Sequence, residues 1–145
     1  MASGGGRHAR YLASRGYHVD AVDIDPKSIE ALAGIGNITA RIADLERAPW
    51  PYCGQCFDGI VVANYLHRPL LPLLVDAVAA GGVLIYETFA AGNERFGRPA
   101  NPDHLLNHGE LLEVLRGRLR VVAYEEITLH KPRPAAVQRI CAVRD

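Results

Sequence analysis

The chain has 145 residues, of which 49% are hydrophobic and 22% are charged, and this composition is typical of a folded globular domain. Sixteen basic residues balance sixteen acidic ones, so the net charge gives no reason to expect binding to nucleic acid or to an anionic membrane. Three cysteines and no long apolar segment argue against a secreted disulfide scaffold and against a membrane-spanning protein. We therefore expect one cytoplasmic domain that comprises residues 1–145.

The first part of the chain alternates helical and strand patterns. A triple-glycine turn at Gly4–Gly6 precedes the first helical pattern. Asp25 and Pro26 mark the start of a second helix, because aspartate caps free N–H groups and proline fits the first helical turn. Such alternation is typical of a parallel α/β sheet. In chain order, the patterns predict a helix over 7–15, a strand over 18–23, a helix from 25 to about 34, and a strand over 38–43.

The second part continues this alternation and then changes in kind. Two β-rich segments near the C-terminus are joined only by HKPRPA, so they must pair antiparallel if they pair at all. Residues 89–108 are expected to form a long polar loop, and loops of this length are often functional. The remaining patterns predict strands over 58–63, 83–88, 119–129 and 136–143, and helices over about 69–79 and over 109–116.

Glycines and aspartates occupy the positions next to these predicted elements. Gly4 and Gly6 let the backbone bend tightly and approach a ligand without a Cβ in the way. Asp23 ends a predicted strand about 20 residues after the glycines, which is the spacing of an acid that binds ribose hydroxyls. Asp44 follows the next predicted strand, and ligands of open α/β sheets bind outside the carboxyl ends of the strands. These residues predict a nucleotide-type ligand at that edge.

The segment ASGGGRHARYLA, with Asp23 and Asp44 after it, resembles the first cofactor loop of class I S-adenosylmethionine-dependent methyltransferases. The segments NYLHRP, YETF and FGRPANPDHLLNHGEL resemble a bacterial subgroup related to tellurite-resistance-type methyltransferases. The resemblance covers essentially the whole chain. It implies an α/β fold with a Rossmann-like, mostly parallel sheet, helices on both faces and a C-terminal antiparallel hairpin. It also implies methyl transfer from S-adenosyl-L-methionine to a small-molecule acceptor.

The resemblance also implies roles for particular residues. Asp23 would accept hydrogen bonds from the ribose, Ile24 would lie on one face of the adenine, and Asp44 would accept from the adenine amino group. If the acceptor needs a general base, the candidates are Tyr65, His67 and Glu87. The expected cofactor-binding residues are Gly4, Gly6, Asp23, Ile24, Asp44, Leu45 and Asn64. The expected substrate-binding residues are Tyr65, His67, Arg68, Glu87, Arg95 and Arg98.

No metal site is expected. Cys53 and Cys56 have the spacing of a zinc or redox pair, but the sequence contains no second such pair and the two lie in a predicted loop. His104 and His108 are four residues apart, yet they belong to a segment that leads into a predicted helix. We therefore expect none of these four residues to bind a metal ion.

The family's first strand, and the acidic residue that ends it, have no counterpart in this sequence, because Met1 stands where that strand would finish. In the family this strand lies in the middle of the sheet. Each of its buried side chains would contribute roughly 1.5–3 kcal/mol, which is large beside a total domain stability of about 5–15 kcal/mol. We therefore expect an N-terminally truncated domain whose native form begins upstream of Met1.

Two other functions are compatible with the sequence. The pattern Gly4-x-Gly6-x-x-Ala9, followed by Asp23, also fits the fingerprint of NAD(P)-dependent oxidoreductases. Asp44 and the C-terminal hairpin favour the methyltransferase over this alternative. The second alternative is an inactive or partner-dependent, truncated methyltransferase-like protein. The sequence does not indicate the oligomeric state.

Overall fold

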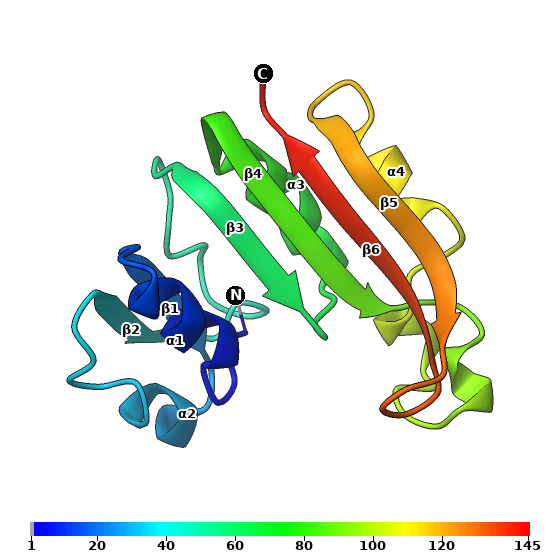
Figure 1. Cartoon of the computed structure of the whole chain (residues 1–145), viewed down its shortest axis with the longest axis horizontal. Coiled ribbons are helices and arrows are strands. Elements are labelled where there is room, and N and C mark those ends of the chain that lie inside the picture. Colours follow the sequence, from blue (N-terminus) through cyan, green and yellow to red (C-terminus); the bar gives the residue numbers. More distant parts are fainter. Residues whose placement is uncertain (1) are drawn as a thin grey trace. The chain divides into compact units, whose positions relative to one another are not determined.

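A computed structural model describes residues 2–145 and shows a chain of alternating helices and strands (Figure 1). The chain forms two compact units, of which the first ends at Cys53 and the second comprises Gly54–Asp145. Met1, which the sequence analysis placed at the end of a missing strand, lies outside the described residues. Each unit has its own hydrogen-bonded sheet, with two strands in the first and four in the second.

The first unit is a small α/β layer. Its two strands pair in parallel, with Val19 opposite Ile38 and Asp23 opposite Ile42. The Asp25 carboxylate accepts hydrogen bonds from the N–H groups of Lys27 and Ser28, which confirms the predicted helix start. In chain order the elements are α1 (Arg7–Ser14), β1 (Val19–Asp23), α2 (Pro26–Glu30) and β2 (Ile38–Ile42). The buried core of this unit contains Ala9, Ala21 and Leu32.

The second unit is built on a sheet with the strand order β3-β4-β6-β5, and the four strands lie side by side in Figure 1. β3 and β4 are parallel, whereas β6 is antiparallel to both of its neighbours. The antiparallel pairing of the last two strands confirms the predicted hairpin. The strands are β3 (Phe57–Ala63), β4 (Val78–Phe89), β5 (Arg120–Leu129) and β6 (Ala135–Val143). The helices are η1 (Arg68–Leu70), α3 (Leu71–Asp76), η2 (Asn93–Arg95), η3 (Pro102–His104) and α4 (Glu110–Leu115).

β4 is longer than the sequence analysis predicted, because it begins at Val78 rather than at residue 83. The pair Gly81-Gly82, which falls between the predicted helix and the predicted strand, lies inside the strand, where Gly81 donates its N–H to the Arg144 carbonyl. A side chain would not fit at position 82, because a Cβ there would lie 2.9 Å from the carbonyl oxygen of Phe57. The register shift between Phe57 and Gly59 shows that the pair forms an irregularity in the ladder. The predicted helix before it therefore ends early, at Asp76.

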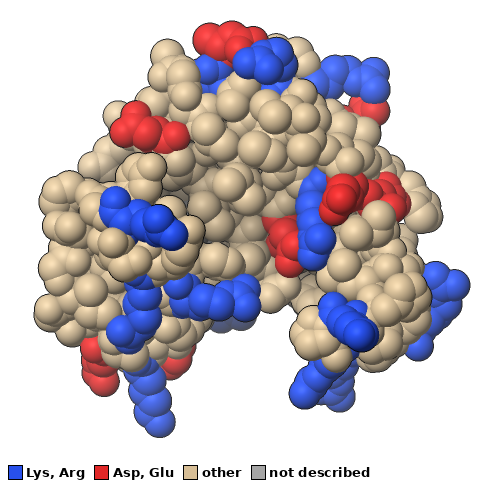
Figure 2. Space-filling view, viewed as in Figure 1, with Lys and Arg blue, Asp and Glu red and all other residues tan. Residues whose placement is uncertain are grey.

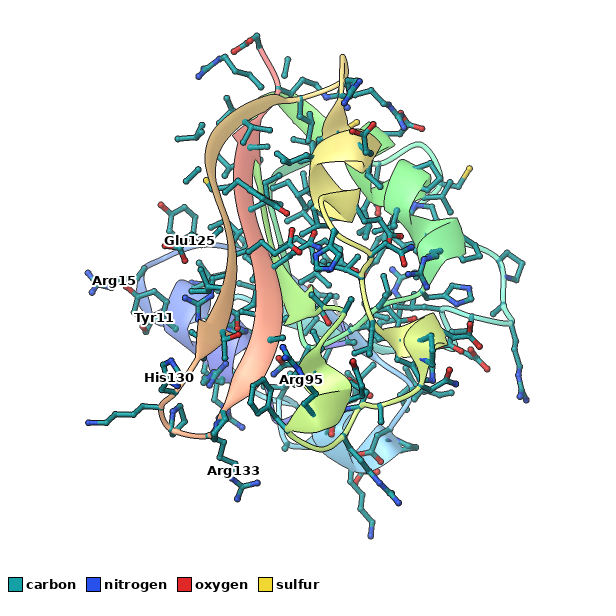
Figure 3. All side chains as sticks on the ribbon, turned by 90° about the vertical axis from the view of Figure 1, so that its right-hand side faces the viewer. Tyr11, Arg15, Arg95, Glu125, His130 and Arg133 are labelled. Atoms are coloured by element: carbon teal, nitrogen blue, oxygen red, sulfur yellow. The ribbon has the colours of Figure 1, made fainter. Side chains whose placement is uncertain are left out.

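Helices α3 and α4 lie on the same side of β5 and β6 in Figure 3. The side chains that are buried in these helices include Leu74 and Val75 of α3 and Leu111 and Leu115 of α4. The fully buried Gln138 of β6 fixes α4 on the sheet through two hydrogen bonds. Its side-chain oxygen accepts from the Leu111 N–H at 3.3 Å, and its amide nitrogen donates to the Asn107 carbonyl at 2.6 Å. A buried amide with both ends bonded costs little and specifies the packing.

Acidic and basic side chains both occur on the face shown in Figure 2, which agrees with the neutral net charge. Among residues 2–145, no helix combines the length and the apolar character that crossing a membrane requires. The described part of the chain also contains no group of three or more His, Cys, Asp or Glu side chains suited to holding a metal ion.

Candidate functional site

The glycine turn and the end of β1 are joined directly by hydrogen bonds. The Gly4 N–H donates to Oδ2 of Asp23 at 2.8 Å, and the Asp25 N–H donates to Oδ1 of the same carboxylate at 2.9 Å. The Ser3 N–H donates to the Val22 carbonyl at 2.9 Å. The Asp23 carboxylate therefore sits where the turn approaches the carboxyl end of the strand. Each carboxylate oxygen carries a further lone pair that can accept from a ligand.

Gly6 is held in its conformation by packing as well as by the turn. Its φ of +74° lies in the left-handed region, which favours glycine. A Cβ at this position would lie 2.3 Å from Cδ2 of Leu32, a side chain that is 0% exposed. Gly4 also has a positive φ, but a Cβ there would meet no atom within 4 Å. The turn thus needs glycine at Gly6 for two reasons and at Gly4 for one.

Asp44 lies at the same end of the two-stranded sheet. The Ala43 N–H donates to the Asp23 carbonyl at 3.0 Å, so the residues that follow β1 and β2 are neighbours. Oδ1 of Asp44 accepts from the N–H groups of Glu46 and Arg47. Its other oxygen, Oδ2, has no hydrogen-bond partner within residues 2–145. Oδ1 of Asp44 therefore stabilises the local turn, while Oδ2 can accept a hydrogen bond from a ligand.

Apolar side chains flank this acidic pair. Ile24 directly follows Asp23 and is 61% exposed, which is unusual for a large aliphatic side chain. Leu45 directly follows Asp44 and is buried. An exposed isoleucine next to a carboxylate offers a flat, apolar contact beside a hydrogen-bond acceptor. This combination suits a ligand that carries both an aromatic ring and hydroxyl groups.

The hydroxyl oxygen of Ser3 is a member of this cluster that sequence reasoning missed. It is buried and has no hydrogen-bond partner in the described chain. Buried polar groups without a partner are rare and call for an explanation. The signal in the sequence was the serine that directly precedes the glycine turn.

The donors and acceptors of this cluster fit the cofactor that the sequence resemblance implies. Ribose hydroxyls and the adenine amino group are donors, and the Asp23 and Asp44 carboxylates are acceptors. The exposed Ile24 provides an apolar contact for a ring. The first unit therefore brings together six of the expected residues: Gly4, Gly6, Asp23, Ile24, Asp44 and Leu45.

The seventh expected cofactor residue, Asn64, lies in the second unit at the carboxyl end of β3. It is exposed and has a φ of +54°, a left-handed conformation that is uncommon for residues other than glycine. Its N–H donates to the Glu87 carbonyl at 2.9 Å, which extends the β3–β4 ladder by one residue. Non-glycine residues held in this region often occur at functional sites.

Tyr65 and His67 follow Asn64 and are half-buried. The Tyr65 carbonyl accepts a hydrogen bond from the hydroxyl of Tyr86 at 2.8 Å. Burial raises the pKa of Tyr86 well above its ordinary value, so this hydroxyl stays protonated even at alkaline pH. The His67 carbonyl accepts from the Leu70 N–H at 3.0 Å and starts the η1 turn. Both residues are therefore fixed through their backbones.

Arg68 binds groups of the protein itself with its whole guanidinium. Its Nε and Nη2 donate to the two carboxylate oxygens of Glu110 at 2.8 and 2.9 Å. Its Nη1 donates to the Asp103 carbonyl, and Nη2 also donates to the Leu105 carbonyl. Arg68 thereby ties the segment after β3 to the end of the long loop and to α4. These contacts give it a structural role that is sufficient to explain its presence.

Glu87, at the carboxyl end of β4, forms an ion pair with Arg139 directly opposite on β6. Arg139 also approaches Glu125 of β5, with 3.5 Å between Nη1 and Oε2. Glu87 and Arg139 are each partly exposed. The last two expected substrate residues, Arg95 and Arg98, are exposed in the loop that follows β4. The second unit thus places Asn64, Tyr65 and Glu87 together at the ends of β3 and β4.

The Arg68–Glu110 contact predicts a pH dependence of stability. Burial alone raises the pKa of Glu110, but the hydrogen bonds from Arg68 and from the Asn107 N–H outweigh it, so the pKa lies below its ordinary value. The unfolded chain then binds this proton more readily than the folded chain. The stabilisation is therefore complete above the ordinary pKa and is lost as the pH falls.

We expect the difference in unfolding free energy between the wild type and Glu110→Gln to shrink as the pH falls from about 6 to about 3. Urea unfolding at several pH values measures this difference. Glu113→Gln on the exposed face of the same helix is the matched control, and its difference from the wild type should change less. A gap that stays constant for Glu110→Gln would contradict the assigned pKa direction.

A model of the family described as "Methyltransferase domain" matches residues 1–80, which is more than half of the chain. The structure is similar to TehB from Haemophilus influenzae, with a TM-score of 0.80 and 21% identity over 99% of this chain and 56% of that chain. The present chain therefore spans little more than half the length of that relative. No match was found among curated proteins.

Two further solved structures are similar over 99% of the chain. One is a TehB-like SAM-dependent methyltransferase from Corynebacterium glutamicum, with a TM-score of 0.69 and 21% identity over 77% of its own length. The other is an S-adenosylmethionine dependent methyltransferase from Mesorhizobium loti, with a TM-score of 0.75 and 18% identity over 88% of its length. These likenesses confirm the predicted α/β fold. Together with the match over residues 1–80, they show that the chain belongs to the methyltransferase domain family.

Proposed function

We propose that this chain binds S-adenosyl-L-methionine through its first unit and transfers a methyl group to a small-molecule acceptor. The observation that carries the proposal is the Asp23 carboxylate, which receives the Gly4 N–H at 2.8 Å while the Asp23 carbonyl receives the Ala43 N–H. These contacts bring the turn and the two strand ends to one place. The family supports methyl transfer, and two of the similar structures are described as S-adenosylmethionine-dependent enzymes.

Each residue of the cluster has a role in this proposal. Asp23 accepts hydrogen bonds from the ribose hydroxyls, and Oδ2 of Asp44 accepts from the adenine amino group. Ile24 covers one face of the adenine. Leu45 is buried and stabilises the segment that carries Asp44. Gly4 and Gly6 allow the backbone to approach the ligand. S-adenosyl-L-methionine, when bound, supplies a methyl group activated by a sulfonium.

The acceptor is bound, in this proposal, by residues at the carboxyl ends of β3 and β4. Asn64 is one of these residues, and Tyr65, His67 and Glu87 are the groups that can take a proton from the acceptor. Glu87 is suited to this role because its partly exposed carboxylate lies near the carboxyl end of β4, where it pairs with Arg139. A base is needed only for acceptors that are protonated at the working pH, so the main task of the protein is alignment and exclusion of water.

We further propose that the protein works in the cytoplasm. All three cysteines are free thiols, and Cys53 and Cys56 are exposed. Exposed thiols of this kind persist in a reducing compartment. Determining the thiol content of the protein purified from the native cell tests this point, since oxidised cysteines would contradict it.

Replacing Asp23 by asparagine is expected to weaken the binding of S-adenosylhomocysteine at least about tenfold, a loss of about 1.4 kcal/mol. Asparagine keeps the shape but turns one acceptor oxygen into a donor, so it cannot receive both ribose hydroxyls. Isothermal titration calorimetry measures the affinity directly. Asp20→Asn, at an exposed position of the same strand, is the matched control and should bind like the wild type.

The same titration with NADH separates the proposal from the oxidoreductase alternative. Wild-type protein that binds NADH more tightly than S-adenosylhomocysteine would overturn the proposed function. Equal affinities of the wild type and Asp23→Asn for S-adenosylhomocysteine would remove Asp23 from the site.

A further inference from the structure

Five basic residues gather at one edge of the sheet in the second unit. β4 and β5 run in the same direction, because each is antiparallel to β6. The loop after β4 and the turn after β5 therefore leave the sheet at the same edge, which β3 also reaches at Asn64. Figure 3 shows Arg95 beside the start of β6, and His130 and Arg133 on the turn that precedes it. We call this group the basic surface: Arg95, Arg98, His130, Lys131 and Arg133.

The basic surface is distinguished by the absence of ion pairs. Within residues 2–145, none of its five members forms a salt bridge. The other arginines of the second unit that form ion pairs with carboxylates are Arg68, Arg116, Arg118, Arg120 and Arg139. Arg144 donates to the Val78 and Val75 carbonyls instead. Among the arginines and lysines of the second unit, those without a carboxylate partner therefore lie at this edge, apart from Arg144. Open α/β sheets bind their ligands at the carboxyl ends of the strands.

A buried asparagine joins the two segments that carry these charges. Asn93 is only 2% exposed. Its amide nitrogen donates to the Pro99 carbonyl at 2.9 Å, and its side-chain oxygen accepts from the Ala136 N–H at 3.2 Å. Pro99 directly follows Arg98, and Ala136 lies three residues after Arg133. The fold thus fixes the loop and the turn next to each other by a buried side chain that is hydrogen-bonded at both its oxygen and its nitrogen.

Local backbone chemistry restrains the basic residues further. Arg98, Lys131 and Arg133 are each followed by a proline, which restricts the preceding residue as well as itself. Arg95 donates from Nε to the Gly92 carbonyl and lies over the ring of Phe96 at 5.7 Å. The nearby acid, Glu94, uses its carboxylate to accept the Gly92 N–H at 2.9 Å. Because these residues are already restrained, less conformational entropy is lost when a ligand binds.

We propose that the basic surface binds a multiply charged anionic group of the methyl acceptor. Cations that converge from two loops match more than one negative charge, and arginine is well suited to carboxylate and phosphate groups. The acceptor's reactive end then lies toward Asn64 and Tyr65 on the same edge of the sheet. This inference rests on the proposed function for the identity of the ligand as an acceptor, while the anion site itself does not.

The test uses citrate and inorganic pyrophosphate as probes of the full chain at low ionic strength, followed by calorimetry. We expect the wild type to bind at least one probe and the double variant Lys131→Gln/Arg133→Gln to bind it at least about tenfold more weakly. Binding should weaken with added salt. A preference for citrate identifies a carboxylate acceptor, and a preference for pyrophosphate identifies a phosphate acceptor.

Arg116→Gln is the matched control, because Arg116 is an exposed arginine of the same unit with 74% of its side chain accessible, outside the basic surface. It should bind the probes like the wild type, and thermal melting checks that all variants fold. Failure of the wild type to bind either probe, or equal binding by the double variant, would overturn the inference. Titration with S-adenosylhomocysteine separates the two proposals, since the double variant should retain wild-type affinity for it. Probe binding without S-adenosylhomocysteine binding would leave the anion site standing and remove the proposed function.

Discussion

Gly6→Ala is expected to lower the free energy of unfolding of the first unit by about 2–5 kcal/mol. An alanine at a φ of +74° is strained by roughly 1–2 kcal/mol. Its Cβ would also lie 2.3 Å from Cδ2 of Leu32, whose side chain is 0% exposed. Overpacking of this kind costs about 1–3 kcal/mol. Urea unfolding measures the loss, and calorimetry with S-adenosylhomocysteine should show weaker binding as well.

The neighbouring glycines provide two controls that separate the two causes. Gly4 has a positive φ but open space around a Cβ, so Gly4→Ala should show the backbone strain alone. Gly5 has neither a positive φ nor a close neighbour, so Gly5→Ala should be nearly neutral. The expected order of stability is therefore Gly5→Ala, then Gly4→Ala, then Gly6→Ala. A Gly6→Ala variant as stable as Gly5→Ala would show that the contact with Leu32 relaxes freely.

Arg68→Leu is expected to destabilise the second unit by about 2–3 kcal/mol. The variant leaves the partly buried Glu110 carboxylate without its bidentate partner and removes the donors to the carbonyls of Asp103 and Leu105. Leaving such groups unsatisfied costs about 1–3 kcal/mol, and more when one of them is charged. Leucine retains most of the aliphatic contact of the arginine stem. Urea unfolding monitored by circular dichroism gives the difference from the wild type.

Arg68→Lys tests whether charge or geometry matters, because lysine keeps the charge but cannot form the two parallel bonds to Glu110. We expect it to recover only part of the lost stability. Arg116→Leu is the matched control, since its ion pair with Glu113 is exposed and contributes less than about 1 kcal/mol. Equal effects at the two positions would contradict a structural role for Arg68.

Strand ends are the part of the fold that the sequence predicted best. The apolar pattern before Asp23 and the Asp25-Pro26 helix start placed β1 and the start of α2 to within a residue or two, whereas α2 ends at Glu30 rather than near residue 34. Both signals are local, since a strand ends where its alternation stops and a helix begins where a side chain can cap it. The common position of Asp23 and Asp44 then followed from parallel pairing, and the Ala43–Asp23 hydrogen bond confirms that the two strand ends are adjacent.

Contacts between distant segments were beyond the reach of the sequence. Arg68 meets Glu110 across 42 positions, and no local pattern marks either residue as the partner of the other. The start of β4 was wrong for a related reason, because Gly81-Gly82 carries the local signal of a turn. What overrides that signal is the pairing of this segment with Phe57 on one side and Arg144 on the other. Tertiary pairing decided both cases.

Three residues of the basic surface are followed by prolines, and this affects proteolysis. Exposed loop tips are preferred sites of nicking, and trypsin cleaves after arginine and lysine except where proline follows. Arg98, Lys131 and Arg133 all precede prolines, so their peptide bonds are protected although their side chains are exposed. The bond after Arg95 is then the point within the basic surface that trypsin can cut. The same residues that hold positive charge in place thus shield two exposed loops from a common class of protease.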